Sequence, residues 1–231
     1  GKRYLDIVGV IAVVSLGHEN PVIAKAIADQ ANTLVHVSNF FANTVATKAA
    51  VEISSLMADA GAGDGQVFFC NSGAEANEAA IKLARKFGGR GRHAIVTAYG
   101  SFHGRTLGAL ALTGQPAKHE VFQPMPDGFR YCEFGDIESL KTQIDPTVAA
   151  VMLESIQGEG GVISADPAYL QAVQALCRER GLLLIIDEVQ TGFCRTGKWF
   201  GFEHAGISPD AVTMAKGMGN GMPVGALWAR R

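Results

Sequence analysis

The sequence has few of the features that mark several large classes of protein. Its four cysteines are far apart and form no CxxC pair. This argues against a disulfide framework or a zinc site and favours reduced thiols. No cluster of histidine, cysteine and acidic residues has the spacing of a metal site, so we expect no metal.

Charge and hydropathy exclude further classes. A net charge of −2 gives no basic surface for nucleic acid. No apolar run approaches the roughly 20 residues that cross a bilayer, and residues 1–11 do not have the pattern of a secretion signal. We therefore expect a cytoplasmic protein with neither a nucleic-acid nor a membrane partner.

What the sequence does contain is a regular alternation of strand and helix patterns. With 231 residues, 48% of them hydrophobic, the chain can bury a large core. The alternation predicts an α/β fold with a mostly parallel central sheet and helices on both faces. The predicted strands span residues 66–70, 93–98, 129–134, 148–153, 182–186, 211–214 and 224–228. The predicted helices span residues 22–34, 45–59, 73–87, 137–143 and 167–180.

The most informative strand is the apolar run LLLII (182–186), which ends in Asp187 and Glu188. Such a run is typical of a buried parallel strand, and ligands bind at the carboxyl ends of these strands. Burying a lone carboxylate is costly, so Asp187 needs a partner. Alternation along the strand places Glu188 on the other face, where we expect a structural role. A P-loop ATPase is excluded because Trp199 follows GFCRTGK (192–198) where a Ser or Thr is required.

Two segments that follow strands could contribute to a ligand site at the same edge. Ser72 is a good N-cap for the helix that begins at Gly73, and this helix N-terminus could bind an anion such as phosphate or could simply be well capped. The loop YGSFHGRT (99–106) carries Phe102 and Arg105. These side chains could stack on a planar ligand and bind a carboxylate, or the loop could be an ordinary surface loop.

A third segment, MAKGMGNGMPVG (214–225), places Lys216 in a glycine-rich turn after a predicted strand. A desolvated lysine can act as an amine nucleophile and form a Schiff base. The alternative is a solvated loop lysine, and the lysine alone does not decide between the two.

Together these segments resemble the class III (subgroup II) pyridoxal-phosphate (PLP) aminotransferases of fold type I. Within that family the similarity is greatest to the acetylornithine/succinylornithine branch. The matching segments follow the family order along nearly the whole chain. They are LGHENP (16–21), HVSN (36–39), NSGAEANEAAIKLAR (71–85), SFHGRT (101–106), ESIQGEGG (154–161), IIDEVQTGFCRTG (185–197) and AKGMGNGMPVGA (215–226).

The resemblance implies PLP as cofactor and assigns roles to the residues in these motifs. Lys216 would hold the cofactor covalently and carry protons, and Asp187 would pair with the pyridine nitrogen. Gln190 would contact the phenolic oxygen, and Phe102 would stack on the ring. The phosphate would lie at the helix N-terminus, formed by Ser72, Gly73 and Ala74.

The family also implies a reaction and a substrate site. Arg105 resembles the arginine that binds the substrate's α-carboxylate, and Glu159 resembles a glutamate that gates the site. The terminal amine of N-acetylornithine, or a similar ω-amine, would pass to 2-oxoglutarate and give glutamate and a semialdehyde, as in arginine biosynthesis. The alternatives are an ornithine or 4-aminobutyrate aminotransferase, a glutamate-semialdehyde aminomutase, and an inert PLP-domain fragment.

The family pattern also predicts a domain organisation. Residues 1–45 would be an N-terminal segment, and residues 46–231 would form the PLP-binding large domain. Family chains begin with a further N-terminal segment and continue into a C-terminal small domain, so we expect this chain to be a fragment that lacks both. The full-length protein would be a homodimer.

Overall fold

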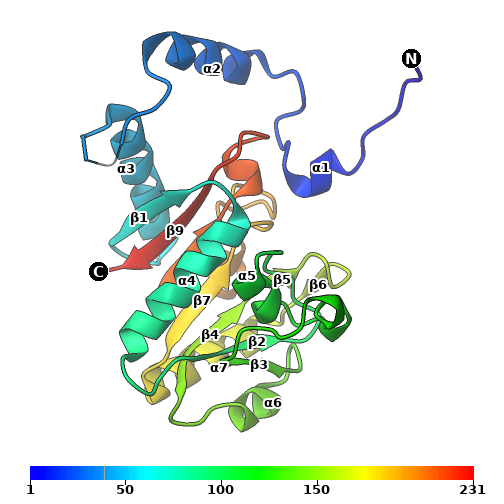
Figure 1. Ribbon diagram of the computed structural model, residues 1–231, viewed down its shortest axis with the longest axis vertical. Coiled ribbons are helices and arrows are strands. Elements are labelled where there is room, and N and C mark those ends of the chain that lie inside the picture. The colour runs from blue at the N-terminus through cyan, green and yellow to red at the C-terminus, as the bar shows by residue number, and fades with distance from the viewer. Residues whose placement is uncertain (39) are drawn as a thin grey trace.

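The computed structural model of the chain describes residues 1–38 and 40–231. Its centre is a seven-stranded sheet with helices on both faces (Figure 1), which confirms the predicted α/β fold. The sheet strands are β1 (Gly65–Cys70), β2 (Ala94–Ala98), β3 (Phe129–Cys132), β4 (Val148–Leu153), β7 (Leu183–Asp187), β8 (Ala211–Met214) and β9 (Gly225–Arg230). A separate hairpin pairs β5 (Ile156–Gln157) with β6 (Ile163–Ser164).

The strand order is β1-β9-β8-β7-β4-β2-β3. Five neighbouring strands, from β8 to β3, run parallel to one another. Strand β9 is antiparallel to both of its neighbours, β1 and β8. The sheet is therefore mostly parallel, as predicted, and the carboxyl ends of β2, β4, β7 and β8 lie at one edge.

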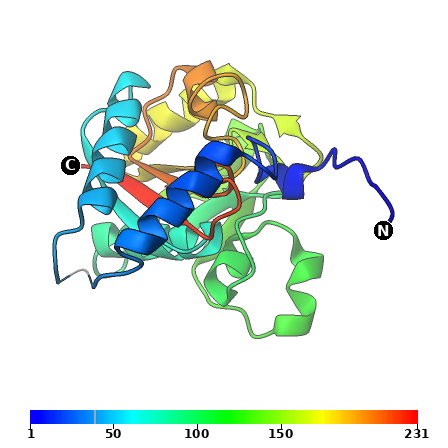
Figure 2. The same cartoon turned by 90° about the horizontal axis from the view of Figure 1, so that it is seen from above.

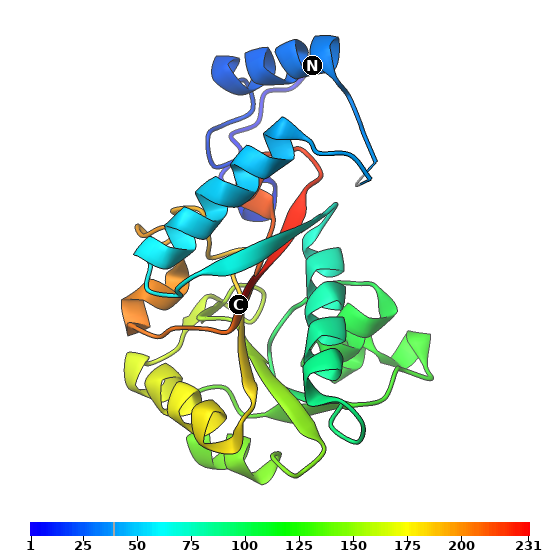
Figure 3. The same ribbon diagram turned by 90° about the vertical axis from the view of Figure 1, so that its left-hand side faces the viewer.

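Helices pack on both faces of this sheet, so its central strands are apolar on both sides. In β4, Ala150 and Met152 belong to the core beneath α4 (Gly73–Gly88), whereas Val151 and Leu153 belong to the opposite core with α7 (Pro167–Arg180). Figure 3 shows α4 and α7 on opposite sides of the sheet. Gly181, in a left-handed conformation with φ of 60°, ends α7 and turns the chain into β7, as only glycine does at no steric cost.

The remaining helices are smaller or lie nearer the periphery. They are α1 (Gly9–Ala12), α2 (Pro21–Thr33), α3 (Thr44–Asp59), α5 (Leu107–Leu112) and α6 (Ile137–Thr142), with the 3₁₀ turns η1 (Pro116–Lys118), η2 (Glu120–Phe122), η3 (Gly201–Ala205) and η4 (Lys216–Met218). Helix α2 has no buried residues and lies across the end of the molecule in the view from above (Figure 2). Asn39, the last residue of the HVSN segment, lies outside the described residues.

The described residues include neither a metal cluster nor a membrane-spanning helix. Among them, no group of three or more His, Cys, Asp or Glu side chains could hold a metal ion. No helix in the described part of the chain is long and apolar enough to span a membrane.

Candidate active site

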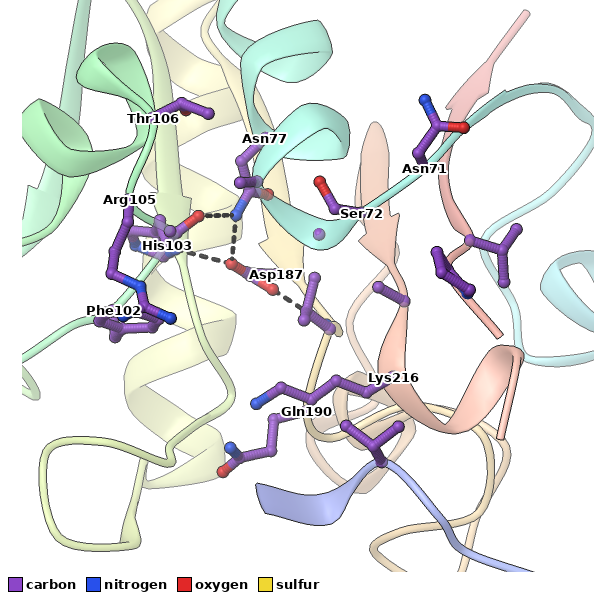
Figure 4. A pocket seen from close by; sticks show the side chains of 18 of the residues that line it. Asn71, Ser72, Asn77, Phe102, His103, Arg105, Thr106, Asp187, Gln190 and Lys216 are labelled. Atoms are coloured by element: carbon purple, nitrogen blue, oxygen red, sulfur yellow. Dashed lines mark hydrogen bonds and ion pairs between the residues drawn. The ribbon is translucent and has the colours of Figure 1, made fainter. Parts of the chain in front are cut away.

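A cavity of about 540 Å³ opens at the edge where β2, β4, β7 and β8 end. Its lining includes every residue that the sequence predicted for the site. These are Ser72, Gly73, Ala74, Phe102, Arg105, Glu159, Asp187, Gln190 and Lys216. Figure 4 shows Ser72 at the start of α4, Phe102 and Arg105 on the loop after β2, and Asp187, Gln190 and Lys216 at and after the ends of β7 and β8. Glu159 lies in the turn between β5 and β6.

Asp187, at the end of β7, is buried with 4% of its surface exposed. Its Oδ2 lies 2.7 Å from His103 Nδ1 and accepts a hydrogen bond from Asn77 Nδ2 at 2.9 Å. Its Oδ1 accepts the Val189 N–H at 2.9 Å. Because a carboxylate only accepts hydrogen bonds, Nδ1 of His103 must carry a proton. These three donors compensate the charge that burial would otherwise disfavour.

The His103 ring is itself fully enclosed. Its Nε2 lies 3.1 Å from Thr97 Oγ1, and its backbone N–H donates to Thr113 Oγ1 at 2.9 Å. Burial acts to lower the pKa of His103, but the hydrogen bond and the charge of Asp187 outweigh it, and the net pKa is raised. His103 and Asn77, for which the sequence predicted no role, are the side chains that hold the central carboxylate.

Lys216 starts the turn η4 directly after β8, with φ of 44°. Figure 4 shows its side chain extending into the cavity between Asp187 and Gln190. Among the described residues its amine has no hydrogen-bond or ion-pair partner. Burial lowers the pKa of Lys216, although the nearby acids Asp187, Glu159 and Glu154 oppose this effect. The solvated-lysine alternative is therefore not supported, because the amine faces the cavity and is partly desolvated.

The N-terminus of α4 faces the same cavity. Ser72 caps it by accepting the Glu75 N–H at 3.2 Å, and Glu75 Oε2 in turn accepts the Asn71 N–H at 2.7 Å. Since the first amides of a helix have no intrahelical acceptor, those of Gly73 and Ala74 can donate to an anion. Gly73 also has a packing role, because a Cβ there would lie 2.8 Å from a methyl group of Val189.

The remaining predicted residues differ in how firmly they are held. The ring of Phe102 is half-buried, and Lys118 Nζ lies 5.1 Å from its centroid. Arg105 and Glu159 line the cavity but are exposed. Neither forms a hydrogen bond or ion pair with another side chain in the described ranges. Both are therefore free to meet a ligand.

Glu188 lies next to Asp187 but points elsewhere. It is fully buried and accepts hydrogen bonds from Thr191 Oγ1 at 2.6 Å, Gly201 N at 2.9 Å and Phe202 N at 2.8 Å. Burial raises the pKa of Glu188 to about 7. Its contacts fasten the start of η3 to the end of β7, in agreement with the predicted structural role.

Comparison with known proteins identifies the family. The model for aminotransferase class III matches residues 1–231. The chain belongs to the class III aminotransferases. The acetylornithine aminotransferase of Caldanaerobacter subterraneus subsp. tengcongensis is 52% identical over 235 residues, covering 100% of this chain and 58% of the relative. That of Methanocaldococcus jannaschii is 47% identical over 231 residues, covering 98% of this chain and 57% of the relative.

Solved aminotransferase structures have the same fold. N-acetylornithine aminotransferase from Stenotrophomonas maltophilia superposes with a TM-score of 0.83 at 38% identity, covering 99% of this chain and 57% of that one. An amine transaminase from an uncultivated Pseudomonas species in its PLP-bound form gives a TM-score of 0.93 at 29% identity, covering 98% of this chain and 57% of that one. The chain thus spans little more than half the length of these relatives.

Class III aminotransferases depend on PLP, and the cavity offers groups that suit this cofactor. The start of α4 presents amides to an anion such as a phosphate. The Phe102 ring offers a face for a planar ligand. The Asp187 carboxylate can stabilise a protonated ring nitrogen, and the partly desolvated amine of Lys216 can attack a carbonyl group.

Proposed function

We propose that this chain is the cofactor-binding part of a PLP-dependent acetylornithine aminotransferase. It would pass the terminal amino group of N-acetylornithine, or a similar ω-amine, to 2-oxoglutarate, giving glutamate and a semialdehyde for arginine biosynthesis. The observation that carries the proposal is one cavity that holds both a buried carboxylate, fixed by His103 and Asn77, and the free amine of Lys216. The names of the relatives support the choice of substrate.

In this proposal each part of the cavity has a defined task. Bound PLP would supply an electron sink for the negative charge that forms when the substrate carbon loses a proton. Asp187 would keep the ring nitrogen protonated, because its own charge is held in place by three donors. Gln190 and the ring of Phe102 would orient the cofactor, and the amides that follow Ser72, those of Gly73 and Ala74, would bind its phosphate.

Lys216 has two tasks that need an uncharged amine. It would hold the cofactor covalently through Nζ, and the same Nζ would accept a proton from the substrate carbon and later donate a proton. Partial burial lowers its pKa and raises the fraction of neutral amine near pH 7. Its position on a short turn after β8 leaves the four-carbon side chain able to reach more than one atom in the cavity.

Arg105 and Glu159 would recognise the substrates. An exposed guanidinium at the cavity can bind a carboxylate through two parallel hydrogen bonds, which suits the α-carboxylate of N-acetylornithine. Glu159 carries the opposite charge and would disfavour an acidic group at its own position. Together they would distinguish the amine donor from the dicarboxylate acceptor.

We further propose that residues 46–231 form the PLP-binding large domain and that the full-length protein is a cytoplasmic homodimer. Exposed apolar side chains in and before α3 support an association surface, since apolar side chains that gather on a surface mark interaction sites. Val35, Phe40, Phe41, Val45 and Val51 are all exposed in or near α3.

Single-turnover absorbance measurements test the substrate assignment. The PLP-loaded chain is mixed separately with N-acetylornithine, ornithine and 4-aminobutyrate, and loss of the lysine-bound PLP absorbance is followed. The fastest conversion is expected with N-acetylornithine. Faster conversion of ornithine would favour the activity named for a Toxoplasma gondii relative that superposes with a TM-score of 0.92. No conversion of any donor by the loaded chain would favour an inert PLP-binding fragment.

A further inference from the structure

A second buried acid, Glu154, lies at the cavity directly after β4. Its exposed fraction is 6%, and it lines the same cavity as Asp187 and Lys216. It has no task in the function proposed above. Burial raises the pKa of Glu154 above its ordinary value, which the nearby charge of His103 and two hydrogen bonds oppose. A buried acid with a shifted pKa that faces such a cavity is a candidate for a functional role.

The contacts of Glu154 indicate what that role is. Its Oε2 accepts the Phe102 N–H at 3.1 Å, and its Oε1 accepts the Gly158 N–H at 3.3 Å. Phe102 belongs to the loop that also carries Arg105. Gly158 belongs to the turn between β5 and β6 that also carries Glu159. One carboxylate therefore joins two loops that approach the cavity from different strands.

Among the described residues, one other hydrogen bond connects the two loops. Gln157 Nε2 donates to Tyr99 O at 2.9 Å, so the loops remain connected when Glu154 is altered. That amide does not line the cavity. Glu154 accepts the N–H of Phe102 itself and so helps to fix the backbone that carries the ring.

We propose that Glu154 is a positioning residue that fixes the Phe102 loop and the Glu159 turn against the cavity, so that the ring and the gating acid face the cofactor correctly. The proposal rests on the proposed function, since it assumes PLP in this cavity. Its structural half, the joining of the two loops by Glu154, does not depend on PLP and can be measured without it.

The chain offers a matched control in Glu188. It is also a buried glutamate after a central strand that accepts two backbone N–H groups, those of Gly201 and Phe202. Unlike Glu154, it does not line the cavity. Glu154→Gln and Glu188→Gln therefore make the same chemical change, and only one of them faces the proposed cofactor.

Two measurements test the proposal. Amide hydrogen exchange of the PLP-free chain should be about tenfold faster or more at Phe102, at Gly158 or at both in Glu154→Gln, because glutamine has one acceptor oxygen where the carboxylate has two. In Glu188→Gln the faster exchange should appear at Gly201, at Phe202 or at both instead. The visible circular dichroism of bound PLP should weaken in Glu154→Gln and stay unchanged in Glu188→Gln.

The outcomes separate the alternatives. Unchanged exchange at Phe102 and Gly158 would overturn the joining of the loops. Faster exchange with an unaltered dichroism would show that Glu154 is only structural, and would overturn its positioning role. If the unaltered chain binds no PLP, the proposed function fails while the exchange result still decides the structural half. Should Glu154→Gln not fold, Glu154→Asp keeps the charge but is one methylene shorter, and it should release at least one of the two amides.

Discussion

The amide of Asn77 is predicted to hold Asp187, and Asn77→Ala tests this directly. Its Nδ2 donates to Asp187 Oδ2 at 2.9 Å and to His103 O at 2.6 Å. A hydrogen bond to a charged acceptor contributes about 1.5–3 kcal/mol, and one to a neutral acceptor about 0.5–1.5 kcal/mol. Asn77 Oδ1, however, is buried without a partner among the described residues. Removing such an atom removes its desolvation penalty and stabilises the folded state by about 1–3 kcal/mol. The net loss of unfolding free energy should be about 1–2 kcal/mol.

Urea unfolding of the PLP-free chain measures this loss, and a PLP titration measures its consequence. The affinity for PLP should fall about tenfold, the equivalent of about 1.4 kcal/mol, because Asp187 keeps only His103 and the Val189 amide. Asn71→Ala is the stability control, since its side chain binds Glu75 Oε2 in an exposed pair that contributes at most about 1 kcal/mol. An Asn77→Ala variant as stable as this control, with unaltered PLP affinity, would refute the reasoning.

Three further predictions concern other parts of the site and its support. The raised pKa of Glu188, about 7 against an ordinary 4.5, means that the folded state binds its proton more tightly, so this stabilisation is complete below pH 4.5 and is lost as pH rises through about 7. Between pH 4.5 and pH 8, the free energy of unfolding should fall by about 3 kcal/mol less in Glu188→Gln than in the unaltered chain. An equal fall in both proteins would contradict the raised pKa of Glu188. Gly73→Ala should cost about 1–3 kcal/mol, because the new methyl group meets Val189; a variant with unchanged melting temperature would show that this contact relaxes freely. Arg105→Ala should raise the KM for the amine donor without changing the melting temperature, since Arg105 is exposed, and an unchanged KM would remove it from the substrate site.

The parts of the site that follow strands could be predicted from the sequence alone. Continuous apolar runs mark β4 and β7, and in a parallel sheet the residues that follow such runs must meet at one edge. The run before Asp187 therefore predicted this carboxylate at the ligand-binding edge, whereas Lys216 was placed in the same site only by the family resemblance. The hairpin of β5 and β6 was not predicted, because strands of two residues carry no measurable alternation.

The partners of Asp187 could not be predicted in the same way. Asn77 is 110 positions from it and His103 is 84, and no local pattern relates residues that far apart. Asn77 did leave a signal, a polar residue between the buried Ala76 and Ala80 on the inner face of α4. Buried polar groups require partners, so a polar residue on a predicted core face can indicate the back of a site.

The central claim is that Lys216 holds PLP in this cavity, and absorbance of the reconstituted chain tests it most directly. Lysine-bound PLP absorbs near the border of the visible and ultraviolet ranges, and borohydride should abolish that band and fix the cofactor on the peptide that contains Lys216. Lys216→Ala should show only the spectrum of free PLP. An unchanged lysine-bound band in Lys216→Ala, or borohydride fixation on another lysine, would contradict the account.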